Sequence, residues 1–180
     1  MLRMIIEGVG FDHLKQTVVV LKDWEGQKLL PIWIGPSEAK AIALELEGAR
    51  PSRPLSHDIL LGLIHMVQGK VARVVINDLQ DSTFFATIDV DTPHGMKHID
   101  SRPSDAIAVA VRAKCPVFVD GSVESALIEM SEVVTSDPTV ENPAENLFDT
   151  PSTELSEPES RPKDADEIER FKRLLGDLGD

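Results

Sequence analysis

The sequence predicts one α+β domain followed by a disordered acidic tail. Three observations lead to this prediction. Several stretches rich in β-branched residues have the composition and the alternation of strands. Other stretches repeat apolar side chains at intervals of three and four residues, which is typical of helices. The charge changes along the chain: residues 1–120 carry 13 Lys and Arg against 15 Asp and Glu, and residues 121–180 carry 5 against 16.

The N-terminal third indicates three strands and one helix. The strands are "MLRMIIEGVGF", "QTVVVLKDW" and "QKLLPIWIG", and Gly35 and Pro36 interrupt the third of them. From residue 37 to residue 47 the apolar period becomes helical, with Ala39, Ile42, Ala43 and Leu46 on one side. Gly48 is expected to end this helix in a left-handed conformation.

The middle of the chain predicts a second helix and a hairpin. The helix has one apolar stripe and ends at Gly69; the stripe consists of Ile59, Leu60, Leu63, Ile64 and Val67. The hairpin joins "KVARVVINDL" to "TFFATIDVD" through a turn around Gln80-Asp81-Ser82, and "GMKHID" adds a short strand. A third helix over 103–114 and the strand "PVFV" follow, and residues 121–134 are expected to form a short closing helix.

The composition predicts a domain boundary near residue 134. Residues 135–163 are rich in Pro, Ser, Thr and acids with little to bury, so we expect a disordered linker. Residues 164–180 are expected to form a short amphipathic helix with Ile168, Phe171, Leu174, Leu175 and Leu178 on one side. Docking of this helix on its own domain, on a second subunit or on another protein stays open.

Charge and hydropathy argue against two classes of partner. The net charge of −13 repels nucleic acid at long range. No stretch approaches the roughly 18 apolar residues of a membrane span, and no basic segment precedes an apolar one at the N-terminus, so a cytoplasmic protein is expected. Cys115 is the single cysteine, which excludes an internal disulfide. No His stands beside it in the sequence, so a structural thiol is expected rather than a nucleophile.

Two helix starts share the pattern Pro-Ser-acid-Ala, at residues 36–39 and 103–106. Capping chemistry alone explains the pattern: proline suits the first helical position, the acid faces the positive end of the helix dipole, and Gly35 or Ser101 can cap. The second start is richer, since Asp100-Ser101-Arg102-Pro103-Ser104-Asp105 gathers two carboxylates, a guanidinium and two hydroxyls where an anion could bind. The structural alternative is an ion pair from Arg102 to Asp100 or Glu38 that joins both helix starts.

A third group lies in "RPLSHDILLGL", where His57 and Asp58 occupy the first helical turn. An acid in the first turn is ordinary dipole chemistry and a lone histidine is usually structural. The functional alternative is that His57 acts as a general base, tuned by a nearby carboxylate. The remaining histidines lack the spacing of a zinc site, and the chain has no Gly-rich phosphate loop and no Gly-x-Ser-x-Gly motif.

Taken in order, these segments resemble the bifunctional nuclease domain family. The matching blocks are "LPIWIGPSEAKAIALEL", "RPLSHDIL", "VVINDLQDSTFFATI" and "IDSRPSDAIAVAVR" with "PVFV", and the resemblance covers about residues 1–132. It implies an α+β fold with a mixed, largely antiparallel sheet and three main packed helices, assembled as a homodimer or higher homo-oligomer. It also implies nuclease activity on DNA and RNA, with nucleic acid as the partner.

The resemblance is carried over residue by residue to polar positions of this chain. The matching residues are Glu38, His57, Asp58, Asp78, Asp100, Arg102, Ser104 and Asp105. We expect a catalytic group made of Glu38, His57, Asp58, Arg102 and Asp105. Arg102 and Ser104 would bind the substrate phosphate. Carboxylates suit Mg²⁺ or Mn²⁺, for which Asp100 and Asp105 are the candidate ligands.

A second class of function stays open beside the nuclease. The same polar residues could form a buried cap and ion-pair network in a non-catalytic oligomeric module that is regulatory or binds a ligand. Convergence of Glu38, His57, Arg102 and Asp105 on an open cleft favours the enzyme. Burial of these residues in a subunit interface favours the module.

Overall fold

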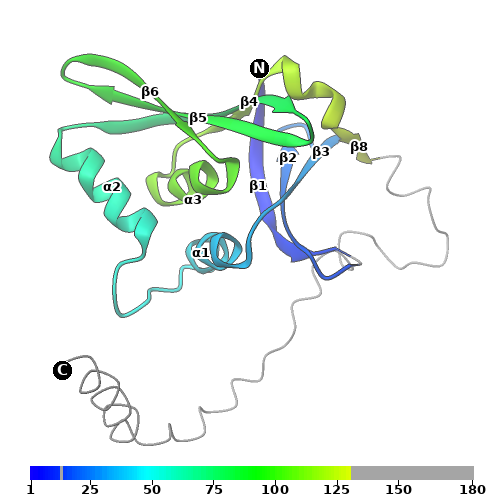
Figure 1. Cartoon of the computed structure of the whole chain (residues 1–180), viewed down its shortest axis with the longest axis horizontal. Coiled ribbons are helices and arrows are strands. Elements are labelled where there is room, and N and C mark those ends of the chain that lie inside the picture. Colours follow the sequence, from blue (N-terminus) through cyan, green and yellow to red (C-terminus); the bar gives the residue numbers. More distant parts are fainter. Residues whose placement is uncertain (13, 131–180) are drawn as a thin grey trace, which may run out of the picture. The chain divides into compact units, whose positions relative to one another are not determined.

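The computed structural model describes residues 1–12 and 14–130, and Figure 1 shows how their helices and strands are arranged. The elements in chain order are β1 (Leu2–Phe11), β2 (Thr17–Asp23), β3 (Lys28–Trp33), α1 (Pro36–Leu46), α2 (Ser56–Met66), β4 (Lys70–Gln80), β5 (Thr83–Thr92), β6 (Gly95–Ser101), α3 (Pro103–Ala113), β7 (Val117–Val119), η1 (Gly121–Ala126) and β8 (Ile128–Glu129). The predicted order of strands and helices is confirmed up to β7. The predicted linker and C-terminal helix lie outside the described residues.

One mixed sheet organises the described part of the chain. Its eight strands follow the order β6-β5-β4-β7-β1-β2-β3-β8. Every neighbouring pair is antiparallel except β4 and β7, which run parallel. The expected mixed, largely antiparallel sheet is therefore confirmed. The three-residue strand β7 joins the two halves of the sheet, since it pairs with β1 on one side and β4 on the other.

Turn chemistry fixes the register of the longest hairpin. Asp81 and Ser82 both have positive φ values, 47° and 62°. Two successive left-handed residues match the right-handed twist of paired strands, which is the geometry of the favoured two-residue hairpin turns. The predicted turn between β4 and β5 is thus confirmed. Gly48 has a φ of +68° after α1, as expected for a residue that ends a helix.

Helix α3 is the centre of the core. It contacts α1 and α2 as well as strands β4 and β5. All five residues from Ala106 to Ala110 are buried and residues 111–113 are half-buried, so α3 is covered on every side over its first two turns only. Small side chains on α3 let its neighbours approach closely, which brings the starts of the three helices into one region.

Helix α2 differs from the prediction in which of its faces is buried. Ile64 and His57 are buried, and each residue as a whole, backbone included, is 8% exposed. Most of the predicted apolar stripe points to solvent instead: Ile59, Leu60, Leu63 and Val67 are exposed, as is Met66. The apolar period was correct, but α2 meets α3 with the side that carries His57. The exposed stripe is available to another surface.

The C-terminal end of the described chain also differs in detail. Residues 121–134 were expected to form a short closing helix, and the structure has the 3-10 helix η1 followed by the two-residue strand β8. Val123 of η1 is fully buried and anchors this segment on the core. Within residues 1–12 and 14–130, no helix has the length and apolar character needed to cross a membrane.

Candidate functional site

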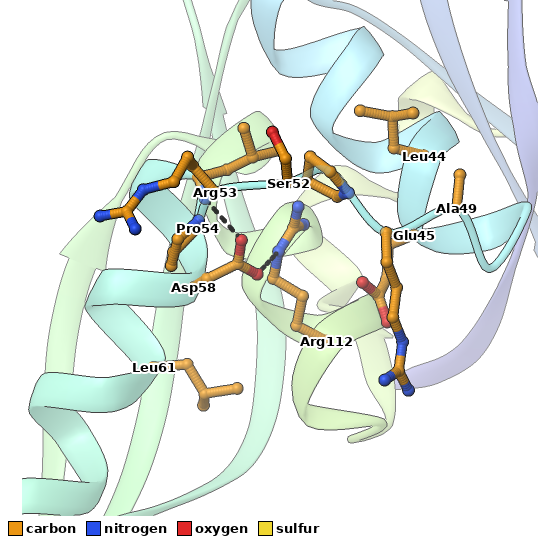
Figure 2. Close-up of a pocket in the computed structure, with 12 residues that line it drawn as sticks. Leu44, Glu45, Ala49, Ser52, Arg53, Pro54, Asp58, Leu61 and Arg112 are labelled. Carbon is orange, nitrogen blue, oxygen red and sulfur yellow. Dashed lines mark hydrogen bonds and ion pairs between the residues drawn. The ribbon is translucent and has the colours of Figure 1, made fainter.

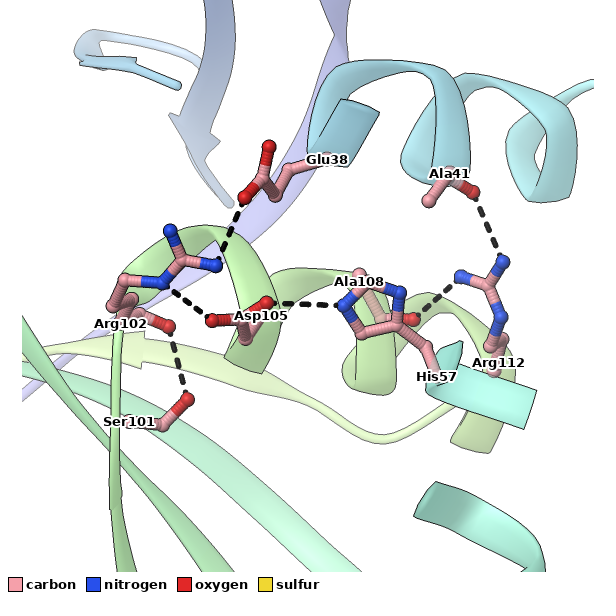
Figure 3. A network of polar contacts seen from close by, with 8 residues as sticks. All are labelled: Glu38, Ala41, His57, Ser101, Arg102, Asp105, Ala108 and Arg112. Atoms are coloured by element: carbon pink, nitrogen blue, oxygen red, sulfur yellow. Dashed lines mark hydrogen bonds and ion pairs between the residues drawn. The ribbon is translucent and has the colours of Figure 1, made fainter. Parts of the chain in front are cut away.

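Arg112 fixes the three helices relative to one another. Its side chain, on the last turn of α3, is only 4% exposed. Nε donates to Asp58 Oδ1 on α2 at 2.7 Å, while Nη1 and Nη2 donate to the carbonyl oxygens of Ala108 at 2.8 Å and Ala41 at 3.1 Å. Figure 2 shows the bond to Asp58, and Figure 3 shows the two bonds to carbonyls. One guanidinium therefore links α1, α2 and α3.

A chain of four charged or polar side chains joins the three helix starts (Figure 3). Arg102 Nη2 donates to Glu38 Oε1 at 2.8 Å, and Arg102 Nε donates to Asp105 Oδ2 at 2.7 Å. Asp105 Oδ1 lies 3.1 Å from His57 Nε2. We call Glu38, Arg102, Asp105 and His57 the helix-start network. The predicted ion pair between Arg102 and Glu38 is confirmed.

Local sequence explains why these side chains meet. Proline occupies the first turn of both α1 and α3, and an acid follows two residues later. Neither helix has a side-chain cap: Gly35 is the N-cap of α1 and Arg102 that of α3, so the expectation that Ser101 caps is wrong. The acids therefore face the positive helix ends while their carboxylates stay available to Arg102.

The side chains of the helix-start network become less exposed from Arg102 through Asp105 to His57. The side chain of Arg102 is 67% exposed, that of Asp105 28%, and that of His57 11%. Burial raises the pKa of Asp105, but the hydrogen bonds from Arg102 and His57 outweigh it, and the pKa lies below its ordinary value. The hydrogen bonds to Asp105 and then Glu38 raise the pKa of Arg102. At neutral pH the network thus has a charged Asp105 carboxylate between a guanidinium and a histidine.

Asp58 follows His57 in the chain but does not join the helix-start network. Its Oδ1 accepts from Arg112, and its Oδ2 accepts from the backbone N–H of Leu55 at 2.7 Å. Burial raises the pKa of Asp58, while the bonds from Leu55 and Arg112 lower it below the ordinary value. Asp58 therefore caps α2 and holds Arg112. These contacts do not connect it to the helix-start network, and its catalytic role stays a prediction.

The other predicted residues lie apart from the helix-start network. Ser104 is 7% exposed on the buried side of α3, which leaves its hydroxyl little access to a substrate. Asp100 is exposed on β6, opposite Thr87 of β5. Asp78 lies near the β4–β5 turn and accepts from Leu79 N and Gln80 Nε2. Burial raises the pKa of the Cys115 thiol to about 11, which agrees with a structural thiol.

The carboxylates of this region leave few oxygens free for Mg²⁺ or Mn²⁺, which prefer several oxygen donors. Both oxygens of Asp105 and both of Asp58 already accept hydrogen bonds, and Glu38 Oε1 accepts from Arg102. Over residues 1–12 and 14–130, no group of three or more His, Cys, Asp or Glu side chains is placed to hold a metal ion. This arrangement does not fit a metal centre, and the ligand pair Asp100 and Asp105 stays a prediction.

Gly35 controls the position of Glu38. A Cβ atom built on Gly35 would lie 2.4 Å from Glu38 Oε2, closer than atoms can approach. We expect Gly35→Ala to displace the flexible Glu38 carboxylate and break its bond to Arg102 at little cost to the free energy of unfolding. NMR signals of the Arg102 guanidinium should shift. Gly62→Ala is the matched control, because its Cβ meets nothing within 4 Å; an Arg102 signal unchanged in Gly35→Ala contradicts the prediction.

Acid should destabilise the fold through three aspartates whose pKa is lowered. Besides Asp58 and Asp105, Asp89 is 3% exposed on β5; burial raises its pKa, and hydrogen bonds from Arg73 and His98 lower it below the ordinary value. A lowered folded pKa gives stability that is present above the unfolded pKa and is lost as pH falls through the folded value. We expect the free energy of unfolding in urea to decrease below about pH 4.

The matched variant for this acid effect is Asp89→Asn, which removes the most buried of the three carboxylates. Its free energy of unfolding should be lower than wild type at pH 7 and should decrease less between pH 5 and pH 3. An equal decrease in both proteins would show that Asp89 is not linked to the acid transition.

Sequence reasoning missed Arg112. The signal was present, because an arginine stands in the last turn of a helix whose other residues from 106 to 113 are all apolar. A guanidinium in a covered helix needs a carboxylate or carbonyl partner, and Asp58, with its carboxylate in the first turn of the neighbouring helix, was available. Asp58 was instead assigned to chemistry.

Comparison with known proteins identifies the family. Residues 19–131 match the Bifunctional nuclease domain. The chain is also similar to uncharacterized proteins from two strains of Mycobacterium tuberculosis, at 44% identity over 108 residues. The aligned segment is 60% of this chain and 64% of each relative, so the match spans less than two thirds of the relatives' length. The matched region contains every residue of the helix-start network, and the chain belongs to the bifunctional nuclease domain family.

Proposed function

We propose that this protein hydrolyses phosphodiester bonds in DNA and RNA. The observation that carries the proposal is the helix-start network, in which Asp105 joins an exposed arginine to a histidine. Hydrolysis of a phosphodiester needs neutralised phosphate charge, an activated water and a protonated leaving group. The network offers groups for the first two needs, and family membership supports the same reaction.

Arg102 is the group proposed to bind phosphate. Its Nε and Nη2 donate to Asp105 and Glu38, and Nη1 has no partner among the residues that the structure describes. Because the side chain is 67% exposed, an incoming phosphate oxygen can reach Nη1. The two carboxylates hold the guanidinium in one orientation, so little conformational freedom is lost when phosphate binds.

His57 is the group proposed to move the proton. Its Nε2 contacts the Asp105 carboxylate, which fixes the ring and favours a proton on that nitrogen. Nδ1 then has a free lone pair. Nothing in the described part of the chain bonds to Nδ1, and no side-chain nitrogen or oxygen there is both buried and unpartnered, so Nδ1 retains some contact with solvent. A water at Nδ1 would lose its proton to His57 as its oxygen bonds to phosphorus, while the P–O bond to the leaving oxygen breaks and that oxygen takes a proton from solvent.

The test is an assay of the purified full chain on single-stranded DNA and on RNA. Each substrate is incubated with Mg²⁺, with Mn²⁺ and with a chelator. Cleavage that persists with the chelator supports a reaction run by the network alone, and cleavage that needs a metal supports the predicted ion. Absence of cleavage under all three conditions, with a protein that shows a cooperative thermal transition, would remove the proposal.

A non-catalytic oligomeric module is the second candidate, and the exposed stripe of α2 favours it. Four large apolar side chains of this helix and that of its C-cap residue are between 44% and 80% exposed: Ile59, Leu60, Leu63, Met66 and Val67. A contiguous exposed apolar surface marks an interaction site more often than a monomer surface. We propose that a second copy of the chain covers this stripe in a homodimer.

Leu63→Asp tests the homodimer. Leu63 is 54% exposed, so the substitution costs the monomer little burial. In light scattering after size-exclusion chromatography we expect the wild type at twice the mass of the chain and the variant at the mass of one chain. Wild-type protein that elutes as a monomer at micromolar concentration contradicts the proposal.

A further inference from the structure

A cavity of about 420 Å³ lies beside the helix-start network. It is bounded by the end of α1, the segment 49–55, the start of α2 and Arg112 of α3 (Figure 2). Its volume falls in the range of small-molecule sites in proteins. Apolar side chains line part of it, including Leu44, Pro51, Pro54 and Leu61. None of the four network residues lines this cavity, so it is a separate surface.

Arginine is concentrated in this cavity. The described residues include six arginines, and three of them line it: Arg50, Arg53 and Arg112. The acids in the lining are Glu45 and Asp58, so the charged lining groups leave an excess of one positive charge. Residues 1–120, which include the whole cavity lining, carry 13 Lys and Arg against 15 Asp and Glu, so the local excess is opposite in sign to their net charge.

Of the six arginines in the described residues, two have no protein partner, and both line this cavity. Arg73 pairs with Asp89, Arg102 with Glu38 and Asp105, and Arg112 with Asp58, and Arg3 stacks over the Trp24 ring at 4.6 Å. Arg50 and Arg53 are exposed and have no hydrogen bond or ion pair within the described ranges. Both unpartnered guanidinium groups thus belong to residues of the same cavity wall.

The wall around these arginines is fixed. Arg112 is held by Asp58 and two carbonyls, and Pro51 and Pro54 restrict the backbone of the segment that carries Arg50 and Arg53. A guanidinium binds phosphate through paired N–H groups, and aliphatic side chains such as Leu and Pro can pack on the flat face of a base. The combination fits a nucleotide better than a simple anion.

We propose that this arginine cavity binds the substrate strand, with two neighbouring phosphates on Arg50 and Arg53 and the base between them on the apolar wall. The inference rests on the proposed function. It adds a second site that binds the strand at a distance from the bond to be cleaved. Asp105 and Arg112 are seven residues apart on α3, which is about 10 Å along a helix. The strand would therefore cover roughly two nucleotides between the helix-start network and the cavity.

Binding of a single-stranded DNA dodecamer with phosphorothioate linkages tests the inference without cleavage. Fluorescence anisotropy gives the Kd from 50 to 200 mM salt. The double variant Arg50→Gln/Arg53→Gln should weaken binding by about tenfold or more and reduce the slope of log K against log salt by about 1.4, which is two phosphate contacts on a single strand. The control Lys70→Gln/Lys97→Gln removes the same charge from exposed positions on β4 and β6 and should stay within about twofold.

The outcomes separate this inference from the proposed hydrolysis. A double variant that keeps the wild-type Kd and salt slope overturns the inference. Free 5′-mononucleotide that binds the wild type and not the double variant, while the dodecamer binds both equally, overturns the assignment to a strand. Loss of dodecamer binding in the double variant supports the cavity even where the wild type cleaves nothing. If Asp105→Asn loses cleavage and the double variant binds as the wild type does, the proposed hydrolysis is supported and the proposed binding of the strand in the cavity is contradicted.

Discussion

Asp105→Asn should reduce the rate of phosphodiester cleavage by about a thousandfold or more, on the scale seen when the carboxylate beside a catalytic histidine is replaced by its amide. The amide keeps the shape of the side chain but has no negative charge. Arg102 loses one of its two carboxylates, and the amide can present its N–H₂ group to His57, which favours the wrong tautomer. The position of the phosphate-binding group and the direction of proton transfer are both disturbed by one substitution.

The fold should tolerate Asp105→Asn. Asp105 is 28% exposed and the amide can still accept a hydrogen bond from Arg102, so we expect the free energy of unfolding to fall by no more than about 1 kcal/mol. Asp100→Asn is the matched control, since Asp100 is an exposed carboxylate outside the helix-start network. Equal loss in both variants would favour the predicted metal pair, and full activity in Asp105→Asn would remove the network from the mechanism.

Arg112→Met should lower the free energy of unfolding by about 3 kcal/mol, the usual cost of removing one partner from a buried ion pair. Methionine fills the space of the aliphatic stem but leaves the Asp58 carboxylate and the carbonyls of Ala41 and Ala108 without their donor. Asp58 is 35% exposed and can be partly rehydrated, which places the cost at the lower end of the range.

Urea unfolding measures the loss in Arg112→Met. Arg53→Met is the matched control, because Arg53 lines the same cavity but is exposed and unpartnered among the described residues. Its free energy of unfolding should change by less than about 0.5 kcal/mol. A loss of similar size in both variants would show that Arg112 does not hold the helices together.

The fold was predictable because, in most elements, the spacing of the apolar residues and the positions of the turn residues indicated the same helix or strand. Alternation marked β5, and the turn residues Asp81 and Ser82 fell where the hairpin reverses. The buried face of α2 was not predictable from the same signals. Its apolar residues recur with helical period, but a sequence does not say whether such a stripe meets its own core or another surface. In the structure α2 turns the side with His57 toward Asp105.

The candidate site was predicted in part for a similar reason. The repeated Pro-Ser-acid-Ala starts indicated equivalent helix ends, and Arg102 was the natural link between their acids, as the contact with Glu38 confirms. The assignment of Asp58 could not be made from proximity in sequence, since adjacent residues on a helix point in directions about 100° apart. His57 faces α3 near its start, and Asp58 faces the end of the same helix.

The position of β7 has a consequence for biosynthesis. Strand β7, Val117 to Val119, lies between β4 and β1 in the sheet. It is synthesised after every other strand of the sheet except β8. A nascent chain that stops before β7 has two separate three-stranded pieces, β1–β3 and β4–β6, whose open edges are templates for wrong pairing. Closure of the sheet must wait until residue 119 has left the ribosome, and until then the edges of β1 and β4 that pair with β7 stay open.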